Sequence, residues 1–91
     1  MAQYKGNFKC IILSPKSLVY ENEVQSVFLT GDQGEYELLP YHYPIVSVLT
    51  KGDIVINNKE KIPIAGGVMR FFANECTILI EESFEKASQQ R

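Results

Sequence analysis

The fold class follows from residues 52–81, whose sequence is GDIVINNKEKIPIAGGVMRFFANECTILIE. Apolar residues recur at every second position in the runs 53–57 and 75–81. This period of two is typical of half-buried β-strands, in which successive side chains point to opposite faces. The polar segments Asn57–Lys61 and Asn74–Glu75 interrupt the apolar runs and are expected to form hairpin turns. Residues 52–81 therefore predict consecutive antiparallel strands.

Short β-rich runs separated by turn residues recur along the whole sequence. The strands expected from these runs are Phe8–Leu13, Leu18–Tyr20, Val24–Thr30, Glu35–Leu39, Pro44–Leu49, Ile54–Ile56, Ile62–Ala65, Val68–Ala73 and Cys76–Glu81. The acidic segment Glu21–Glu23 is expected to be a turn. No stretch from Phe8 to Glu82 sustains the apolar spacing of a helix beyond about two turns. The pattern predicts an all-β fold, namely a flattened β-sandwich or barrel of about 8–10 short strands.

The chain has 91 residues, which fits one domain because domains usually contain roughly 100–200 residues. We expect the sandwich to occupy residues 1–83 and a polar tail to occupy residues 84–91. Ser83 can cap a helix before Glu85, but about two polar turns are too short to be stable alone. The tail is therefore expected to be frayed or a short helix.

Charge and hydropathy exclude several classes of protein. The formal net charge is −2 and the positive charges are scattered singly, without the basic stripe typical of nucleic-acid binders. Apolar runs such as Cys10–Leu13 are far shorter than the roughly 18 residues that a membrane-spanning helix needs. The N-terminus lacks the apolar segment of a secretory signal, so the chain is expected to remain in the compartment where it is made.

Cysteine and histidine usage argues against a metal site. Cys10 and Cys76 each lie inside an apolar run, and we expect them to be buried free thiols that act as small hydrophobic residues. A disulfide between them stays open as an alternative. With one histidine and no CxxC motif, the sequence has no zinc signature.

Motifs that carry chemistry are absent from the sequence. The serines lack a GxSxG frame, and the lone His42 is more often a hydrogen-bonded turn residue than a catalytic base. The glycines of residues 31–34 and 66–67 form no phosphate-binding loop and indicate tight turns instead. Glu35 and Glu37 fit solvated charges on an edge strand. The residues alone therefore predict an all-β domain with no catalytic, cofactor-binding or metal-binding residues.

Residues 30–52 read TGDQGEYELLPYHYPIVSVLTKG. This segment resembles the signature of the N-terminal β-sandwich domain in the epsilon subunit of F-type ATP synthase, which is called delta in mitochondria. The family pattern is a strand, then G-x-x-G-E-[LF]-G-[IV]-L-P-G-H-x-P, an apolar strand and a glycine turn. The matching positions are Gly31, Gly34, Glu35, Leu38 or Leu39, Pro40, His42, Pro44 and Gly52. With the double glycine in residues 64–69, the resemblance covers roughly Phe8–Ser83.

The resemblance implies a non-catalytic subunit of the rotor's central stalk. Such a subunit links gamma to the membrane c-ring and couples ion translocation to ATP synthesis or hydrolysis. The implied location is the cytoplasmic face of the bacterial inner membrane, with the membrane reached only indirectly through the c-ring. The choice between H⁺ and Na⁺ as coupling ion is a property of the c-ring.

The resemblance also implies contact residues for these partners. Ser14 and His42 match family positions that face gamma, and Glu35 matches a position that faces the polar loops of the c-ring. Three tyrosines of the same segment are expected to add contact area, and they are Tyr36, Tyr41 and Tyr43. Aromatic side chains dominate many interfaces, so Tyr41 and Tyr43 are expected to contribute more than Glu35. Further exposed aromatic residues are expected at Phe28 and at Phe71 or Phe72.

The sequence departs from the family pattern in two ways. Glu37 and Tyr41 stand where the family usually has glycine, which is tolerable only if their φ angles are negative. Many family members also continue into a C-terminal pair of helices that contacts the catalytic head and in some bacteria binds ATP. This sequence holds no such hairpin, so it is either a short variant or a trimmed piece of a longer chain. We expect the short variant, and hence no tight ATP binding and no inhibition of ATP hydrolysis by the chain.

An alternative function from a different class is a small β-barrel that binds a ligand or acts as an adaptor unrelated to the rotor. Fold alone does not separate the two readings. A ligand binder should enclose a pocket of several hundred Å³ with convergent polar groups, whereas a rotor subunit should have a solid interior.

Overall fold

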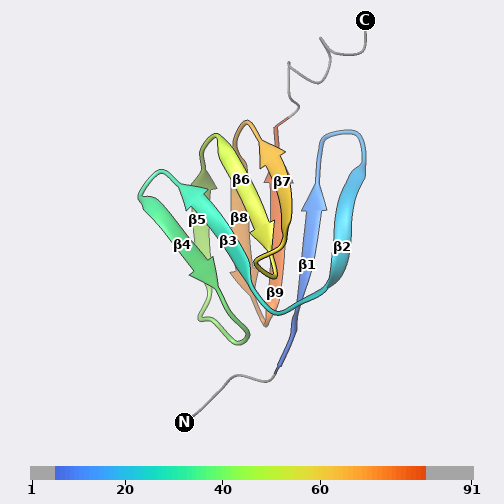
Figure 1. Cartoon of the computed structure of the whole chain (residues 1–91), viewed down its shortest axis with the longest axis vertical. Coiled ribbons are helices and arrows are strands. Elements are labelled where there is room, and N and C mark those ends of the chain that lie inside the picture. The colour runs from blue at the N-terminus through green and yellow to red at the C-terminus, as the bar shows by residue number, and fades with distance from the viewer. Residues whose placement is uncertain (1–5, 82–91) are drawn as a thin grey trace, which may run out of the picture.

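The structure is a computed structural model that describes residues 6–81. These residues contain nine β-strands joined by short turns and loops (Figure 1). The strands are β1 (Phe8–Leu13), β2 (Leu18–Val24), β3 (Val27–Gly31), β4 (Gly34–Leu38), β5 (Ile45–Leu49), β6 (Gly52–Ile56), β7 (Glu60–Ile64), β8 (Gly67–Phe72) and β9 (Glu75–Ile80). No helix occurs within residues 6–81, which confirms the predicted all-β fold. The predicted tail, residues 84–91, lies outside the described residues.

The strands form one curled sheet in the order β2-β1-β9-β8-β5-β3-β6-β7, and β4 pairs with β3. Strands β2, β1, β9, β8 and β5 form one layer, and β3 and β6 pass in front of β5 and β8 (Figure 1). The two layers join where Gly31 at the end of β3 pairs with Leu49 at the end of β5. Strands β1 and β9 pair in parallel, although they come from opposite ends of the described chain. This arrangement confirms the flattened sandwich.

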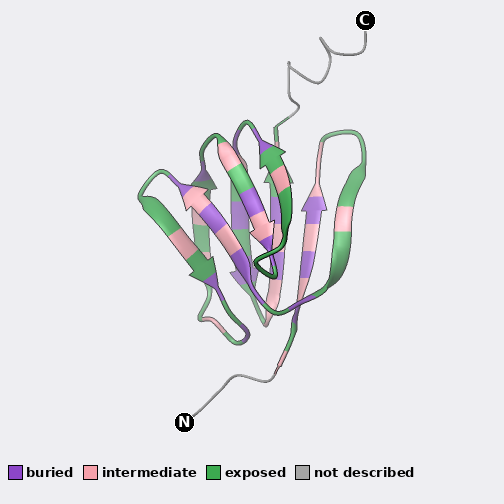
Figure 2. Cartoon of the chain, in the orientation of Figure 1, coloured by how far each residue is buried: buried purple, intermediate pink, exposed green. Residues whose placement is uncertain are grey.

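Hydrophobic side chains from both layers fill the space between them. The buried hydrophobic residues are Phe8, Cys10, Ile12, Val24, Val27, Leu29, Leu38, Leu49, Ile54, Ile56, Ile64, Met69, Phe71, Cys76 and Ile78. Figure 2 shows the underlying alternation, since buried residues lie between more exposed ones along most strands. The rings of Phe8 and Phe71 meet edge to face, with centroids 5.3 Å apart. Each Å² of apolar surface that is removed from water stabilises the folded state by about 25 cal/mol, so this interior supplies the main driving force for folding.

Two hairpin turns adopt the left-handed backbone that asparagine tolerates. Asn57 and Asn58 have φ angles of 55° and 59°, and Ala73 and Asn74 have φ angles of 53° and 60°. Two successive positive φ angles are typical of a type I′ turn, whose twist matches that of the flanking strands. Both predicted hairpins are confirmed. The first turn ends earlier than predicted, because Glu60 and Lys61 already belong to β7. The second turn starts earlier than predicted, because Glu75 already belongs to β9.

The predicted turn at Glu21–Glu23 is wrong, because β2 continues through it to Val24. All three residues pair with β1. The Lys9 ammonium also forms an ion pair with the Glu21 carboxylate at 3.1 Å. Strand β2 lies at the edge of its layer, where charged side chains reach solvent and discourage pairing with other chains. The acidic residues therefore protect an edge strand instead of ending it.

The predicted strand Val24–Thr30 is interrupted at Gln25 and Ser26, which separate β2 from β3. The Asn57 Oδ1 atom accepts hydrogen bonds from the backbone N–H of Gln25 at 2.7 Å and of Ser26 at 3.2 Å. The Asn57 backbone N–H donates to the Ser26 carbonyl oxygen at 2.9 Å. Asn57 thus fixes the point at which the chain crosses from one layer to the other.

Cys10 and Cys76 are directly opposite each other on β1 and β9, and both are fully buried free thiols, as predicted. The neighbouring Cys10 thiol, together with burial, raises the pKa of Cys76 above its ordinary value. The folded Cys76 thiol therefore stays protonated at pH values where a thiol in the unfolded chain ionises, above about 8.5. Because the unfolded state then binds fewer protons than the folded state, the free energy of unfolding decreases as pH rises through that range.

We accordingly expect urea denaturation to show lower stability at about pH 9.5 than at about pH 7.5. The Cys76→Ala variant should show a smaller decrease over the same range, whatever its absolute stability. Equal decreases in the two proteins would contradict a contribution from this thiol.

Candidate partner-binding surface

The outward side of the five-stranded layer carries an exposed hydrophobic surface. Five large hydrophobic side chains on it have 43–67% of their surface exposed, and they are Val46, Val48, Val68, Phe72 and Leu79. All five alternate along β5, β8 and β9 with inward residues such as Leu49, Phe71 and Ile78. These strands are thus apolar on both faces, which is unusual for a face that remains in water.

The pairing register joins part of this surface into one continuous row. Val48 on β5 pairs with Val68 on β8, Val68 pairs with Leu79 on β9, and Leu79 pairs with Leu13 on β1. Leu13 in turn pairs with Leu18 on β2. Neighbouring strands lie about 4.8 Å apart, so this apolar row extends about 19 Å across the layer. We call Val48, Val68, Leu79, Leu13 and Leu18 the apolar row.

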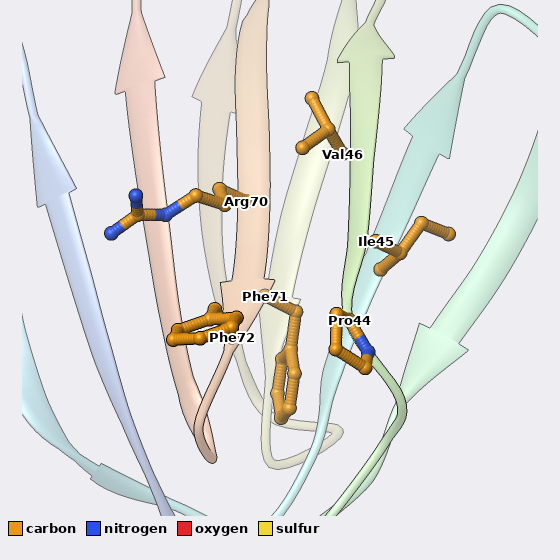
Figure 3. A pocket seen from close by; sticks show the side chains of 6 residues that line it. All are labelled: Pro44, Ile45, Val46, Arg70, Phe71 and Phe72. Carbon is orange, nitrogen blue, oxygen red and sulfur yellow. The ribbon is translucent and has the colours of Figure 1, made fainter.

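A shallow hollow of about 370 Å³ lies beside the apolar row, near the start of β5 and the end of β8 (Figure 3). Its lining residues are Pro44, Ile45, Val46, Arg70, Phe71 and Phe72. The Arg70 side chain extends across β9, where its pairing partner is Thr77 (Figure 3). Arg70 is the one charged residue of this lining, so the hollow lacks the convergent polar groups of a small-molecule site.

Two of the expected contact residues, Ser14 and Glu35, lie where a strand meets a loop or turn. Ser14 follows β1, and its Oγ atom accepts hydrogen bonds from the backbone N–H of Ser17 at 3.1 Å and of Lys16 at 3.3 Å. Glu35 is exposed near the start of β4, beside the turn that joins β3 to β4. Strands β1 and β4 belong to different layers, so the structure does not bring the two residues together.

Tyr41, His42 and Tyr43 lie together in the loop between β4 and β5, at the other end of β4 from Glu35. Tyr41 and Tyr43 are 68% and 70% exposed. The His42 ring lies between Tyr43 and the core, with its centroid 4.3 Å from that of Tyr43 and 5.7 Å from that of Phe71, which it meets edge to face. The His42 Nδ1 atom also lies 2.7 Å from the Tyr43 carbonyl oxygen. His42 thus joins the exposed Tyr43 to the buried Phe71.

The backbone of Tyr41 is left-handed, with a φ angle of 67°, although a bulky residue at a glycine position was expected to require a negative φ. That expectation is wrong. The Asn74 Oδ1 atom accepts a hydrogen bond from the Tyr41 N–H at 2.7 Å, and the Asn74 Nδ2 group donates to the Asn7 carbonyl oxygen at 2.9 Å. These bonds offset a conformation that costs on the order of 1–3 kcal/mol. Glu37, by contrast, is an ordinary residue of β4.

The remaining aromatic residues divide between core and surface. Tyr36 packs against the hydrophobic core, and burial raises the pKa of its hydroxyl above the ordinary value. Phe71 is fully buried, whereas Phe72 is exposed, which resolves the alternative left open by the sequence. Phe28 is half-buried on the outward side of β3, between Glu37 and Val55. Of these residues, Phe72 alone belongs to the exposed hydrophobic surface.

Sequence reasoning missed the apolar row. Its members come from five strands, and their alignment depends on a register that no local pattern specifies. The available signal was the apolar character of both faces in runs such as Val46–Leu49 and Val68–Phe72.

Other kinds of site are not seen in the described part of the chain. Within residues 6–81, no group of three or more His, Cys, Asp or Glu side chains could hold a metal ion. A helix long and apolar enough to cross a membrane is also absent from these residues.

Comparisons with known proteins agree with the fold. Residues 7–86 match the family model of the β-sandwich domain of the ATP synthase delta/epsilon chain. The chain is 36% identical over 91 residues to an ATP synthase epsilon chain of Desulfitobacterium hafniense, covering 94% of this chain and 69% of that one. It is 31% identical over 81 residues to the ATP synthase epsilon chain of Rhodospirillum rubrum, covering 85% of this chain and 60% of that relative. It thus spans about 60% of the length of several curated relatives.

Solved structures show the same fold at low sequence identity. A chain in the central stalk and c-ring structure of the Tetrahymena thermophila mitochondrial ATP synthase superposes with a TM-score of 0.73 and 14% identity, covering 88% of this chain and 67% of that chain. A chain of the Euglena gracilis mitochondrial ATP synthase gives a TM-score of 0.74 and 16% identity, covering 98% and 64%. Together with the match of residues 7–86, these findings show that the chain belongs to the family of ATP synthase delta/epsilon chain β-sandwich domains.

Proposed function

We propose that this chain is a non-catalytic subunit of the central stalk of an F-type ATP synthase. In that role it links gamma to the c-ring and so couples ion translocation to ATP synthesis or hydrolysis. Family membership supports this role over that of an unrelated ligand-binding barrel. The observation that carries the proposal is the apolar row, since exposed hydrophobic surface of this extent marks sites of protein contact. In a bacterium the subunit would lie on the cytoplasmic face of the inner membrane, held there through the c-ring.

The apolar row has the composition expected of the centre of an interface with gamma. Stable interfaces bury about 800 Å² on each partner, and their centres are apolar and enriched in aromatic residues and arginine. The exposed side chains of Val46, Arg70 and Phe72 adjoin the row on the same outward face. This face thus supplies an apolar centre with an aromatic residue and an arginine at its margin.

The polar contacts with the c-ring would lie elsewhere on the molecule. Glu35 is exposed beside the turn that joins β3 to β4, and Asp32 is exposed in the same turn. An exposed ion pair contributes only about 0–1 kcal/mol, so these charges would set the register of the contact more than its strength. Ser14 and the loop from Tyr41 to Tyr43 would extend the contacts with gamma.

The test is binding of purified gamma to the chain, measured by titration calorimetry. We expect Val48→Asp to weaken binding by about 2 kcal/mol or more, because it places a charge within a desolvated contact. Leu39→Asp is the matched control, since Leu39 is also exposed but lies in the loop after β4, outside the apolar row. Thermal melts of both variants should stay close to wild type, because both side chains are on the surface.

Equal binding of gamma by the Val48→Asp and Leu39→Asp variants would contradict the proposed face. Pull-down of gamma together with the c-ring by each variant ranks the loop residues. Tyr43→Ala should weaken assembly with gamma and the c-ring more than Glu35→Ala, because a large aromatic side chain buries more surface than an exposed carboxylate.

A further inference from the structure

Arg70 occupies a position on the outward face that is otherwise mostly hydrophobic. On its own strand, its neighbours on this face are Val68 and Phe72. Across the pairing register it lies between Val46 on β5 and Thr77 on β9. The guanidinium therefore sits within the area that a partner must cover in order to bury the apolar row.

Arg70 makes no ion pair with any carboxylate among residues 6–81. Carboxylates that share its face include Glu75 on β9 and both Glu21 and Glu23 on β2. Glu23 pairs with Lys9 on β1 and lies two strands beyond β9. Glu75 lies diagonally opposite, paired with Phe72, and Glu21 is held by Lys9 at 3.1 Å. In the described part of the chain, the positive charge of Arg70 is thus left for water or a partner to satisfy.

Covering the apolar row would remove water from this guanidinium. Burying a charge without a partner is strongly unfavourable, and an arginine buried in an interface is normally matched by a carboxylate that accepts two hydrogen bonds. Lysine would place its charge at a single point, whereas the planar guanidinium recognises the two carboxylate oxygens together. The apolar surroundings of Arg70 therefore select for an acidic group on the partner.

We propose that the partner that covers the apolar row inserts an Asp or Glu carboxylate against Arg70, within an otherwise apolar contact. The proposal rests on the proposed function, in which that partner is gamma. The guanidinium extends across β9, away from the hollow of about 370 Å³ that Pro44, Val46 and Phe72 line, so the partner's carboxylate would approach it over β9 (Figure 3). An acidic side chain at the margin of an apolar patch is thus the feature that this chain would recognise.

The experiment measures the affinity of purified gamma for four forms of the full chain: wild type, Arg70→Lys, Arg70→Met and Arg70→Glu. We expect Arg70→Glu to weaken binding about 100-fold or more, because it opposes two carboxylates inside the contact. Arg70→Met keeps the long apolar part of the side chain but leaves the partner's carboxylate buried without a positive charge, and it should weaken binding about tenfold or more. Arg70→Lys should fall between wild type and Arg70→Met.

The partner's acidic residue is identified by changing each exposed Asp and Glu of gamma to Arg. One such variant should restore binding to Arg70→Glu by about tenfold or more while weakening binding to wild type. If no acidic variant of gamma restores binding, or if Arg70→Met and Arg70→Glu bind as wild type does, the proposal is overturned.

Two further variants separate the possible failures. If Val48→Asp abolishes binding while Arg70→Glu does not, the face is right and the carboxylate is wrong. If Val48→Asp binds normally, the proposed function of this face fails first. A Glu82→Gln and Glu85→Gln double variant should bind gamma as wild type does; if it instead matched Arg70→Met, the carboxylate would belong to this chain and the proposal would be wrong.

Discussion

Replacing Gly67 with alanine is expected to destabilise the domain by about 2–4 kcal/mol. A Cβ atom at this position would lie 2.3 Å from the Leu79 carbonyl oxygen and 3.1 Å from the Ile80 Cα atom. Both contacts are with backbone, so no side chain can rotate away to relieve them. The clash would force apart β8 and β9 where Gly67 pairs with Ile80.

Gly66→Ala is the matched control for this change. The nearest atoms to a Cβ at Gly66 are the Glu81 carboxylate at 3.3 Å, which can move, and the Leu49 carbonyl oxygen at 3.4 Å. We expect a loss of about 1 kcal/mol or less. Urea denaturation of both variants measures the difference, and equal losses would show that the β8–β9 pairing tolerates a side chain at Gly67.

Phe71→Ala is expected to lower the free energy of unfolding by about 3–5 kcal/mol, whereas Phe72→Ala should change it by about 0.5 kcal/mol or less. Phe71 is fully buried, and its ring forms edge-to-face contacts with the rings of Phe8 and His42. The adjacent Phe72 is 58% exposed on the outward face. The two variants thus delete the same group from opposite sides of one strand.

The same pair of variants distinguishes core from interface. Phe72→Ala should weaken binding of gamma while leaving the thermal melt near that of wild type, because Phe72 borders the apolar row. A large drop in melting temperature for Phe72→Ala, or normal stability for Phe71→Ala, would mean that the register of β8 differs from the one described.

The strands were predictable where one face is buried and the other is polar. The run Glu75–Ile80 shows this alternation except at the exposed Leu79, and its bounds differ from the prediction by one residue at each end. Asparagine-rich turns were likewise recognisable, because Asn57 and Asn58 tolerate positive φ angles at little cost. Local chemistry was sufficient in both cases.

Long-range contacts explain the errors in the strand assignments. Glu21–Glu23 looked like a turn because acidic residues favour solvent, yet an edge strand also exposes its side chains. The break at Gln25 depends on hydrogen bonds from Asn57, which lies far away in sequence. The positive φ angle of Tyr41 depends in the same way on Asn74. None of these long-range contacts can be recognised from the sequence next to the residues that make them.

The candidate contact residues likewise include some that the local sequence predicts and some that depend on long-range pairing. The resemblance identified Tyr41 and Tyr43, and the structure places both on the surface. It could not identify the apolar row, since Leu13 and Leu79 become neighbours only through the parallel pairing of β1 with β9.

That parallel pairing sets the order in which the molecule can be completed during synthesis. Strand β1 leaves the ribosome first, but its partner on one edge is β9, the last strand of the described chain. Until β9 has emerged, β1 can pair only with β2, and an isolated two-stranded hairpin is marginally stable in water. Contacts between such distant segments also carry a large loop-closure cost and form slowly. The nascent chain therefore cannot complete the five-stranded layer before translation has passed Ile80.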